Sequence, residues 1–96
     1  SKINWNENAK TILAKIRAFS PNPGCWFEIK GVRIKVLKAV EVEKTEKAGT
    51  IIDNNMTIAC KKNALQILEL KKEGKKLMSI REYLKGNEIK IGQVLN

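Results

Sequence analysis

Histidine is absent from this chain, and aromatic residues are scarce: two tryptophans, two phenylalanines and one tyrosine occur among 96 residues. Without histidine the chain lacks the usual general base and the commonest zinc ligand. No run approaches the roughly 18 apolar residues of a membrane span, and the first residues lack the apolar segment of a signal peptide. These absences argue against a self-sufficient enzyme, a zinc protein, a membrane protein and a secreted protein.

Cysteine and proline are equally sparse, with two residues of each type. Cys25 and Cys60 form no C-x-x-C pair. A disulfide between them is compatible with the sequence, but two thiols in the core of a cytoplasmic protein are favoured. Pro21, Pro23 and Gly24 together form a break that no helix continues through.

Positive charge is what the sequence has in excess. Nineteen lysine and arginine residues against ten acids give a net charge of +9. On one small domain, spanning residues 1–96, such an excess predicts a polyanionic partner, and nucleic acid before a membrane surface. Residues 30–38 contain four basic residues and no acid, whereas residues 61–96 carry a net charge of +5.

Apolar spacing predicts a helix followed by a hairpin. Apolar residues recur at helical spacing from Ala9 to Phe19, which predicts a helix over residues 6–18. Beyond the proline break the period becomes two, so that residues 25–30 and 32–42 predict a hairpin. The second of these strands has a predicted core face, formed by Val32, Ile34, Val36, Val40 and Val42.

The remaining pattern predicts three short strands and a second helix. Ser79 followed by Glu82 forms a capping box, and Gly86 suits the position just after the helix. Asn54 and Asn55 suit the positive φ of a tight turn. The predicted strands cover residues 50–53, 56–60 and 64–70, a lysine-rich loop covers 71–76, and the helix covers 80–85.

A last apolar pattern, Ile89, Ile91, Val94 and Leu95, is expected to return and close the sheet. The predicted fold class is therefore mainly β with flanking helices. We expect a small antiparallel OB-like Greek-key barrel with one N-terminal helix and one short late helix.

In this order and spacing, the sequence fragments resemble the C-terminal domain of the methionyl-tRNA formyltransferase family. The resemblance extends through the whole chain. The fragments that carry it are Ile3, Asn4 and Trp5; Ile16 to Phe19 with Pro21, Pro23 and Gly24; Phe27, Glu28, Ile29 and Gly31; Ile34 to Ala39; Gly49, Thr50 and Ile51; Leu68 and Leu70; Glu73 to Lys76 with Met78 and Ser79; Tyr83 and Leu84; and Gly92.

The resemblance implies one domain of a larger enzyme, with an OB-like barrel that holds initiator methionyl-tRNA. Formyl transfer from 10-formyltetrahydrofolate belongs to the family's N-terminal Rossmann-like domain, which this chain does not match. We therefore expect no catalytic residue, cofactor site or metal site here. The partners implied are tRNA and the enzyme's own catalytic domain, in a cytoplasmic protein expected to be a monomer without membrane contact. The chain departs from the family pattern at Asn22, where an aromatic is common, at Cys25, and at Val94.

Six basic residues are the candidate tRNA contacts. Arg33 and Lys35 project from one strand face about 7 Å apart, close to the spacing of RNA phosphates. Lys75 and Lys76 follow Gly74 in a loop, and Arg81 and Lys85 share one helix face at i, i+4. The resemblance implies that Lys85, near the helix end, faces the tRNA D-stem. The alternative to RNA contact is that these charges only keep the domain soluble. This alternative is favoured for Lys2, Lys10, Lys44, Lys47, Lys61 and Lys62.

Trp5 and Trp26 are compatible with base stacking, but core or interdomain packing is favoured for both, as is packing for Tyr83. Two other functions stay open. One is the equivalent domain of a formyltransferase acting on a non-RNA substrate, which predicts a weaker basic surface. The other is an independent OB-like binder of single-stranded nucleic acid, which predicts more exposed aromatics than this chain has.

Overall fold

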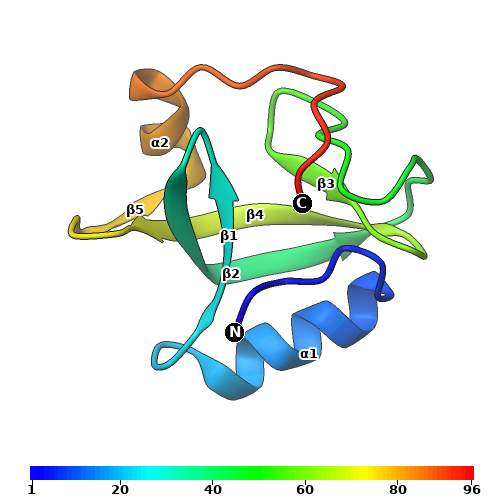
Figure 1. Ribbon diagram of the computed structural model, residues 1–96, viewed down its shortest axis with the longest axis horizontal. Helices are drawn as coiled ribbons and strands as arrows, with labels where there is room; N and C mark the ends of the chain where they lie inside the picture. The colour runs from blue at the N-terminus through cyan, green and yellow to red at the C-terminus, as the bar shows by residue number, and fades with distance from the viewer.

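The computed structural model describes residues 1–96. Its elements are α1 (Ala9–Phe19), β1 (Cys25–Ile29), β2 (Val32–Val42), β3 (Thr57–Ala59), β4 (Ala64–Lys72), β5 (Leu77–Ser79) and α2 (Ile80–Gly86). All strand pairs are antiparallel, in the order β1-β2-β4-β3, and β5 pairs with β4. Figure 1 shows the sheet curled into a half-barrel between the two helices. The predicted fold class, mainly β with one N-terminal and one late helix, is confirmed.

Helix α1 packs one apolar stripe onto the sheet. Ala9, Ile12, Leu13 and Ile16 are its buried residues, as the spacing predicted. Phe19, predicted to belong to the same stripe, is instead 41% exposed, because it ends the helix beside the proline break. The helix begins at Ala9 rather than at residue 6, because Asn8 in front of it has an extended backbone. Each of the larger aliphatic side chains contributes about 2 kcal/mol by leaving water, which fixes the helix against β2.

A bulge in β2 corrects the predicted core face. The pairing of β2 with β4 shifts around Lys38, so that the alternation of inward and outward side chains changes there. Ala39 is consequently buried, whereas Val40, predicted to be inside, is 36% exposed. A strict two-residue period cannot represent an irregularity after which inward-facing residues are three positions apart, as Val36 and Ala39 are.

The segment between β2 and β3 pairs less than expected. Thr50 and Ile51 form only isolated bridges, to Val94 and Ile58 respectively, instead of a strand over residues 50–53. The tight turn after Asp53 has its positive φ at Met56 (60°), not at either asparagine. Asp53 accepts hydrogen bonds from the backbone of Asn55 and Thr57, and these bonds hold the turn.

The C-terminal residues close the sheet only in part. They form no strand; the bridge of Val94 to Thr50, backbone hydrogen bonds to Gly49 and Ile51, and the burial of Leu95 attach this segment to the barrel. Ile91 and Val94 are about half exposed. In Figure 1 this red segment crosses from α2 to the region of β3.

Helix α2 has the predicted capping box. The Ser79 hydroxyl accepts from the Glu82 N–H at 3.1 Å, and the Glu82 carboxylate accepts from the Ser79 N–H at 3.1 Å. Gly86, expected just after the helix, is instead its last residue. Asn87 ends the helix, and its side-chain amide donates to the Tyr83 carbonyl at 3.0 Å. None of the helices is long and apolar enough to cross a membrane.

The core is mostly aliphatic and contains both thiols. Phe27 is fully buried and Trp5 lies edge-on to it, with ring centroids 5.8 Å apart. Tyr83 is 3% exposed, which confirms its packing role. Cys25 and Cys60 are buried free thiols, as favoured from the sequence.

Candidate nucleic-acid interface

One residue from each of four strands lines up across the outer face of the sheet. Trp26 of β1 pairs with Lys35 of β2, Lys35 pairs with Lys71 of β4, and Lys71 pairs with Leu77 of β5. Because residues directly opposite one another project from the same face, this row places two cations between an aromatic and an apolar side chain.

Two hollows flank this row and share Lys35 and Lys71. The first has a volume of about 410 Å³ and the second a volume of about 450 Å³. We call them together the outer-face groove. Arg33 and Lys72 line the first hollow, and Lys75 and Lys76 line the second. Six basic side chains and one acidic side chain, that of Glu73, thus line the outer-face groove.

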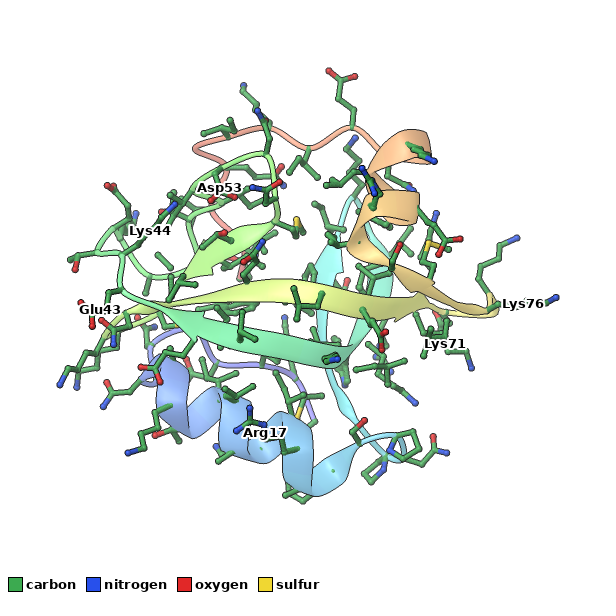
Figure 2. The ribbon with its side chains drawn as sticks, turned by 180° about the vertical axis from the view of Figure 1, so that it is seen from behind. Arg17, Glu43, Lys44, Asp53, Lys71 and Lys76 are labelled. Atoms are coloured by element: carbon green, nitrogen blue, oxygen red, sulfur yellow. The ribbon has the colours of Figure 1, made fainter.

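The structure brings four of the six sequence-predicted residues together in the groove. Arg33 and Lys35 lie on β2, and Lys75 and Lys76 lie in the turn from β4 to β5. Figure 2 shows Lys71 and Lys76 at this end of the sheet, away from Arg17 on α1.

The other two predicted residues are not part of the groove. Arg81 and Lys85 are exposed on α2, and neither lines either hollow. Their assignment as tRNA contacts stays a prediction from the sequence.

Sequence reasoning missed Lys71 and Lys72 because it ended β4 at Leu70. The strand continues to Lys72, and its pairing with β2 and β5 carries Lys71 onto the outer face beside Lys35. The available signal was the alternation of Leu70 and Lys71, which continues the strand pattern by one step. The flanking lysines read as a loop instead.

Two of the groove cations are held by hydrogen bonds. Lys35 Nζ donates to the Pro21 carbonyl and to Asn22 Oδ1, both at 3.1 Å. Lys72 Nζ donates to Asn87 Oδ1 at 3.2 Å, which ties the end of β4 to the end of α2. Each ammonium has three donors, so both retain charge and donors for a ligand.

Trp26 differs from the packing expected of it. It is only half-buried on the outer face, and the Arg33 guanidinium carbon lies 3.7 Å from its ring centroid. Lys2 Nζ is 5.8 Å from the same centroid. Because a guanidinium covers a face of the ring, Trp26 acts first as a cation–π partner, not as a free platform for bases.

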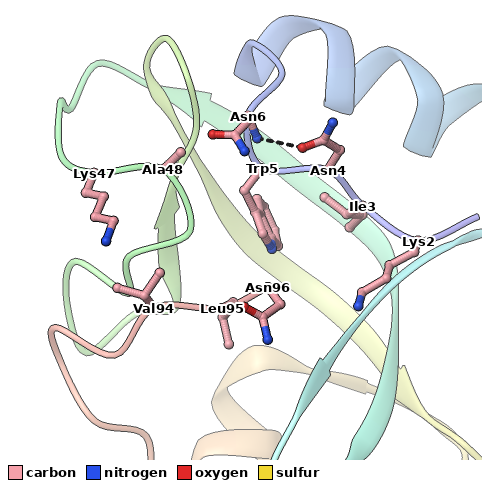
Figure 3. A pocket seen from close by; sticks show the side chains of 10 residues that line it. All are labelled: Lys2, Ile3, Asn4, Trp5, Asn6, Lys47, Ala48, Val94, Leu95 and Asn96. Carbon is pink, nitrogen blue, oxygen red and sulfur yellow. Dashed lines mark hydrogen bonds between the residues drawn. The ribbon is translucent and has the colours of Figure 1, made fainter.

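Trp5, in contrast, belongs to the core as expected. It is 3% exposed, and its indole N–H has no hydrogen-bond partner. Figure 3 shows it at the centre of a third hollow, of about 600 Å³, between the two ends of the chain. Lys2 and Lys47 are the only charged side chains that line this hollow, so it lacks the cation density of the outer-face groove.

The titratable groups with shifted pKa values lie outside the groove. Burial raises the pKa of Cys60 to about 12, and burial also raises the pKa of Tyr83. Burial acts to raise the pKa of Asp53, but hydrogen bonds from Thr57, Asn55 and Lys44 outweigh it and lower that pKa. No cluster of three acidic or cysteine residues could hold a metal ion. What the groove can do chemically is neutralise neighbouring anionic groups.

Comparison with known proteins shows which family the chain resembles. The profile of the formyl transferase C-terminal domain matches residues 1–88. The chain is 43% identical over 93 residues to the methionyl-tRNA formyltransferase of Paramagnetospirillum magneticum, which covers 97% of the chain and 30% of that protein. It is 39% identical over 98 residues to the methionyl-tRNA formyltransferase of Neisseria meningitidis, an alignment that covers 99% of this chain and 32% of that protein. The chain thus spans about a third of the length of these relatives.

A solved structure supports the fold. HypX from Aquifex aeolicus, in its A392F-I419F variant, superposes with a TM-score of 0.68 at 20% identity, over 96% of this chain and 20% of that one. At this identity the likeness concerns the fold alone. The profile match and the sequence relatives together show that the chain belongs to the formyl transferase C-terminal domain family.

Proposed function

We propose that this chain is the tRNA-binding domain of a methionyl-tRNA formyltransferase. In this proposal the outer-face groove holds initiator methionyl-tRNA by its backbone phosphates. An N-terminal catalytic domain, for which this chain holds no residues, transfers the formyl group of 10-formyltetrahydrofolate to the methionyl amino group. The parent enzyme is expected in the cytoplasm and as a monomer.

The observation that carries the proposal is the pairing of Lys35 with Lys71 at the junction of the two hollows. This pair of lysines joins the two hollows into one basic track that crosses β1, β2, β4 and the turn to β5. Repeating phosphates favour such a track, because each cation placed against the backbone releases a condensed counterion. A domain that only packs against a catalytic half is expected to have a weaker basic surface.

The geometry also bears on the two other functions. A binder of single-stranded nucleic acid needs aromatic faces free for stacking, whereas the only aromatic in the groove has a face covered by Arg33. An accessory domain of a formyltransferase with a non-RNA substrate predicts no measurable tRNA binding, which the experiment below distinguishes.

The direct test is tRNA binding by the 96-residue chain at several salt concentrations. If about four phosphates are contacted, the logarithm of the affinity falls against the logarithm of salt concentration with a slope of about −3 to −4. Initiator and elongator tRNAs are expected to bind with similar affinity, because the contacts are to phosphates. The chain alone is expected to formylate nothing.

The control is a matched charge change at the other end of β4. Lys71→Glu, in the groove, is expected to weaken binding about tenfold and to reduce the salt slope by about 1. Lys62→Glu, which precedes β4 about 25 Å away along the strand, is expected to change affinity less than threefold. Equal losses from both variants, or a flat salt response, would contradict the proposal.

A further inference from the structure

Arg33 is held in place by its neighbour without being neutralised by it. It lies on β2, one step along the outer face from Lys35, and its guanidinium carbon is 3.7 Å from the centroid of the Trp26 ring on β1. A planar guanidinium stacked on an indole face loses part of its freedom to rotate. The edge of the guanidinium, which carries the N–H groups, is left free by such a stack.

The N–H groups of Arg33 have no acceptor within the protein. A guanidinium has five donors, and none of those of Arg33 forms a hydrogen bond or an ion pair, although Glu28 is its direct cross-strand partner. The two ion pairs of the molecule join Lys15 to Glu7 and Lys44 to Asp53. Lys35 and Lys72, in the same hollow, each donate to a protein oxygen. Arg33 is thus the cation of this hollow that is stacked on an aromatic ring and has no hydrogen-bond or ion-pair partner.

We infer that Arg33 binds one backbone phosphate of RNA through two parallel N–H···O bonds, and that Trp26 is a positioning residue that holds the guanidinium for this contact. The inference rests on the proposed function, because the RNA that Arg33 would contact is the tRNA bound in the outer-face groove. Phosphate is the group that fits: the guanidinium fork matches two phosphate oxygens, and Lys71 and Lys35 add positive charge beside it.

The inference separates Arg33 from the lysines of the groove. A lysine acts as a point charge that follows any nearby phosphate, whereas a stacked arginine accepts a phosphate in one orientation only. Arg33 would therefore fix the register of the RNA backbone on the track, and the lysines would supply the remaining, less directional attraction. Trp26 would act only through Arg33.

Charge-conserving variants of the 96-residue chain test this with tRNA as the probe. Arg33→Lys keeps the charge and loses the fork, and we expect affinity to fall five- to tenfold. Trp26→Leu is expected to cause a similar loss, and Trp26→Phe, which keeps an aromatic face, to recover most of it. The matched control is Arg17→Lys on α1, expected to stay within twofold of the wild-type chain. Urea unfolding, followed by tryptophan fluorescence, checks that each variant is folded, since the buried Trp5 is present in all of them.

The double variant separates a positioning role from a structural one. If Trp26 acts through Arg33, the variant carrying both Trp26→Leu and Arg33→Lys binds no more weakly than either single variant. If the two substitutions instead lower the affinity independently, so that their fold losses multiply in the double variant, the positioning role is overturned. Wild-type affinity in Arg33→Lys would overturn the phosphate contact while leaving the proposed function standing. Failure of the wild-type chain to bind tRNA would overturn both.

Discussion

Lys35 and Asn22 are joined by a hydrogen bond of 3.1 Å between the lysine ammonium and the amide oxygen. The stem of Lys35 crosses Gly24, where an added Cβ would lie 2.7 Å from Lys35 Cδ. One lysine of the proposed RNA track therefore also fastens the loop between α1 and β1 onto the sheet. Asn22 supplies the acceptor for it.

Substitution of Gly24 tests this double role. Gly24 has a φ of +80°, so Gly24→Ala carries the left-handed penalty of about 1–2 kcal/mol and also forces Lys35 to move. Gly74→Ala is the matched control, because φ there is +77° and nothing lies within 4 Å of the new methyl group. Urea unfolding is expected to show a larger loss for Gly24→Ala. Equal losses would show that the lysine stem contributes nothing at Gly24.

The bulge in β2 gives a second pair of variants with opposite outcomes. Val40 is 36% exposed, so Val40→Thr is expected to change the free energy of unfolding by less than about 0.5 kcal/mol. Ala39 is 4% exposed, and Ala39→Lys would bury a charge without a partner, at a cost of several kcal/mol. Thermal unfolding of both variants checks the register. Tolerance at Ala39 with a loss at Val40 would favour the unbroken alternation read from the sequence.

The same bulge shows that elements set by local spacing can be predicted from the sequence, whereas features set by strand pairing cannot. Helix α1 and the β1–β2 hairpin follow from local spacing, and the capping box of α2 from two residues. The strand β5 was not predicted, because its stability depends on pairing with β4 rather than on its own pattern. Gly86 was misplaced because Asn87 ends α2 by a side-chain hydrogen bond that the glycine rule does not consider.

The candidate site was predictable by residue type but not by arrangement. The basic residues of β2 and of the turn after β4 could be named from charge alone. That Lys71 would lie opposite Lys35 depends on a long-range register. That Arg33 would cover Trp26 depends on a diagonal contact between neighbouring strands, which periodicity does not specify.

The buried thiol of Cys60 predicts a loss of stability at alkaline pH. Burial raises its pKa in the folded protein to about 12, whereas a thiol in the unfolded chain titrates near 8.5. Above about pH 8.5 only the unfolded state loses this proton, so stability falls as pH rises toward 12. The expected loss between pH 8 and pH 10 is about 2 kcal/mol.

The variant Cys60→Ala isolates this contribution from the titration of the lysines and of Tyr83. Urea midpoints measured between pH 7 and pH 10.5 are expected to decline less steeply for Cys60→Ala than for the wild-type chain. Parallel profiles would show that the thiol is not responsible.

Amide NMR during a titration of the ¹⁵N-labelled chain with tRNA shows where on the domain the RNA binds. If the RNA lies in the outer-face groove, the largest changes are expected at Trp26 and its indole N–H, at Arg33 and Lys35, and at Lys71 and the turn after it. Amides at the far end of β4 and on the exposed side of α1 are expected to change little. Changes centred on α1 or on residues 44–47 and 61–62, with the outer-face groove unaffected, would show that the RNA binds elsewhere.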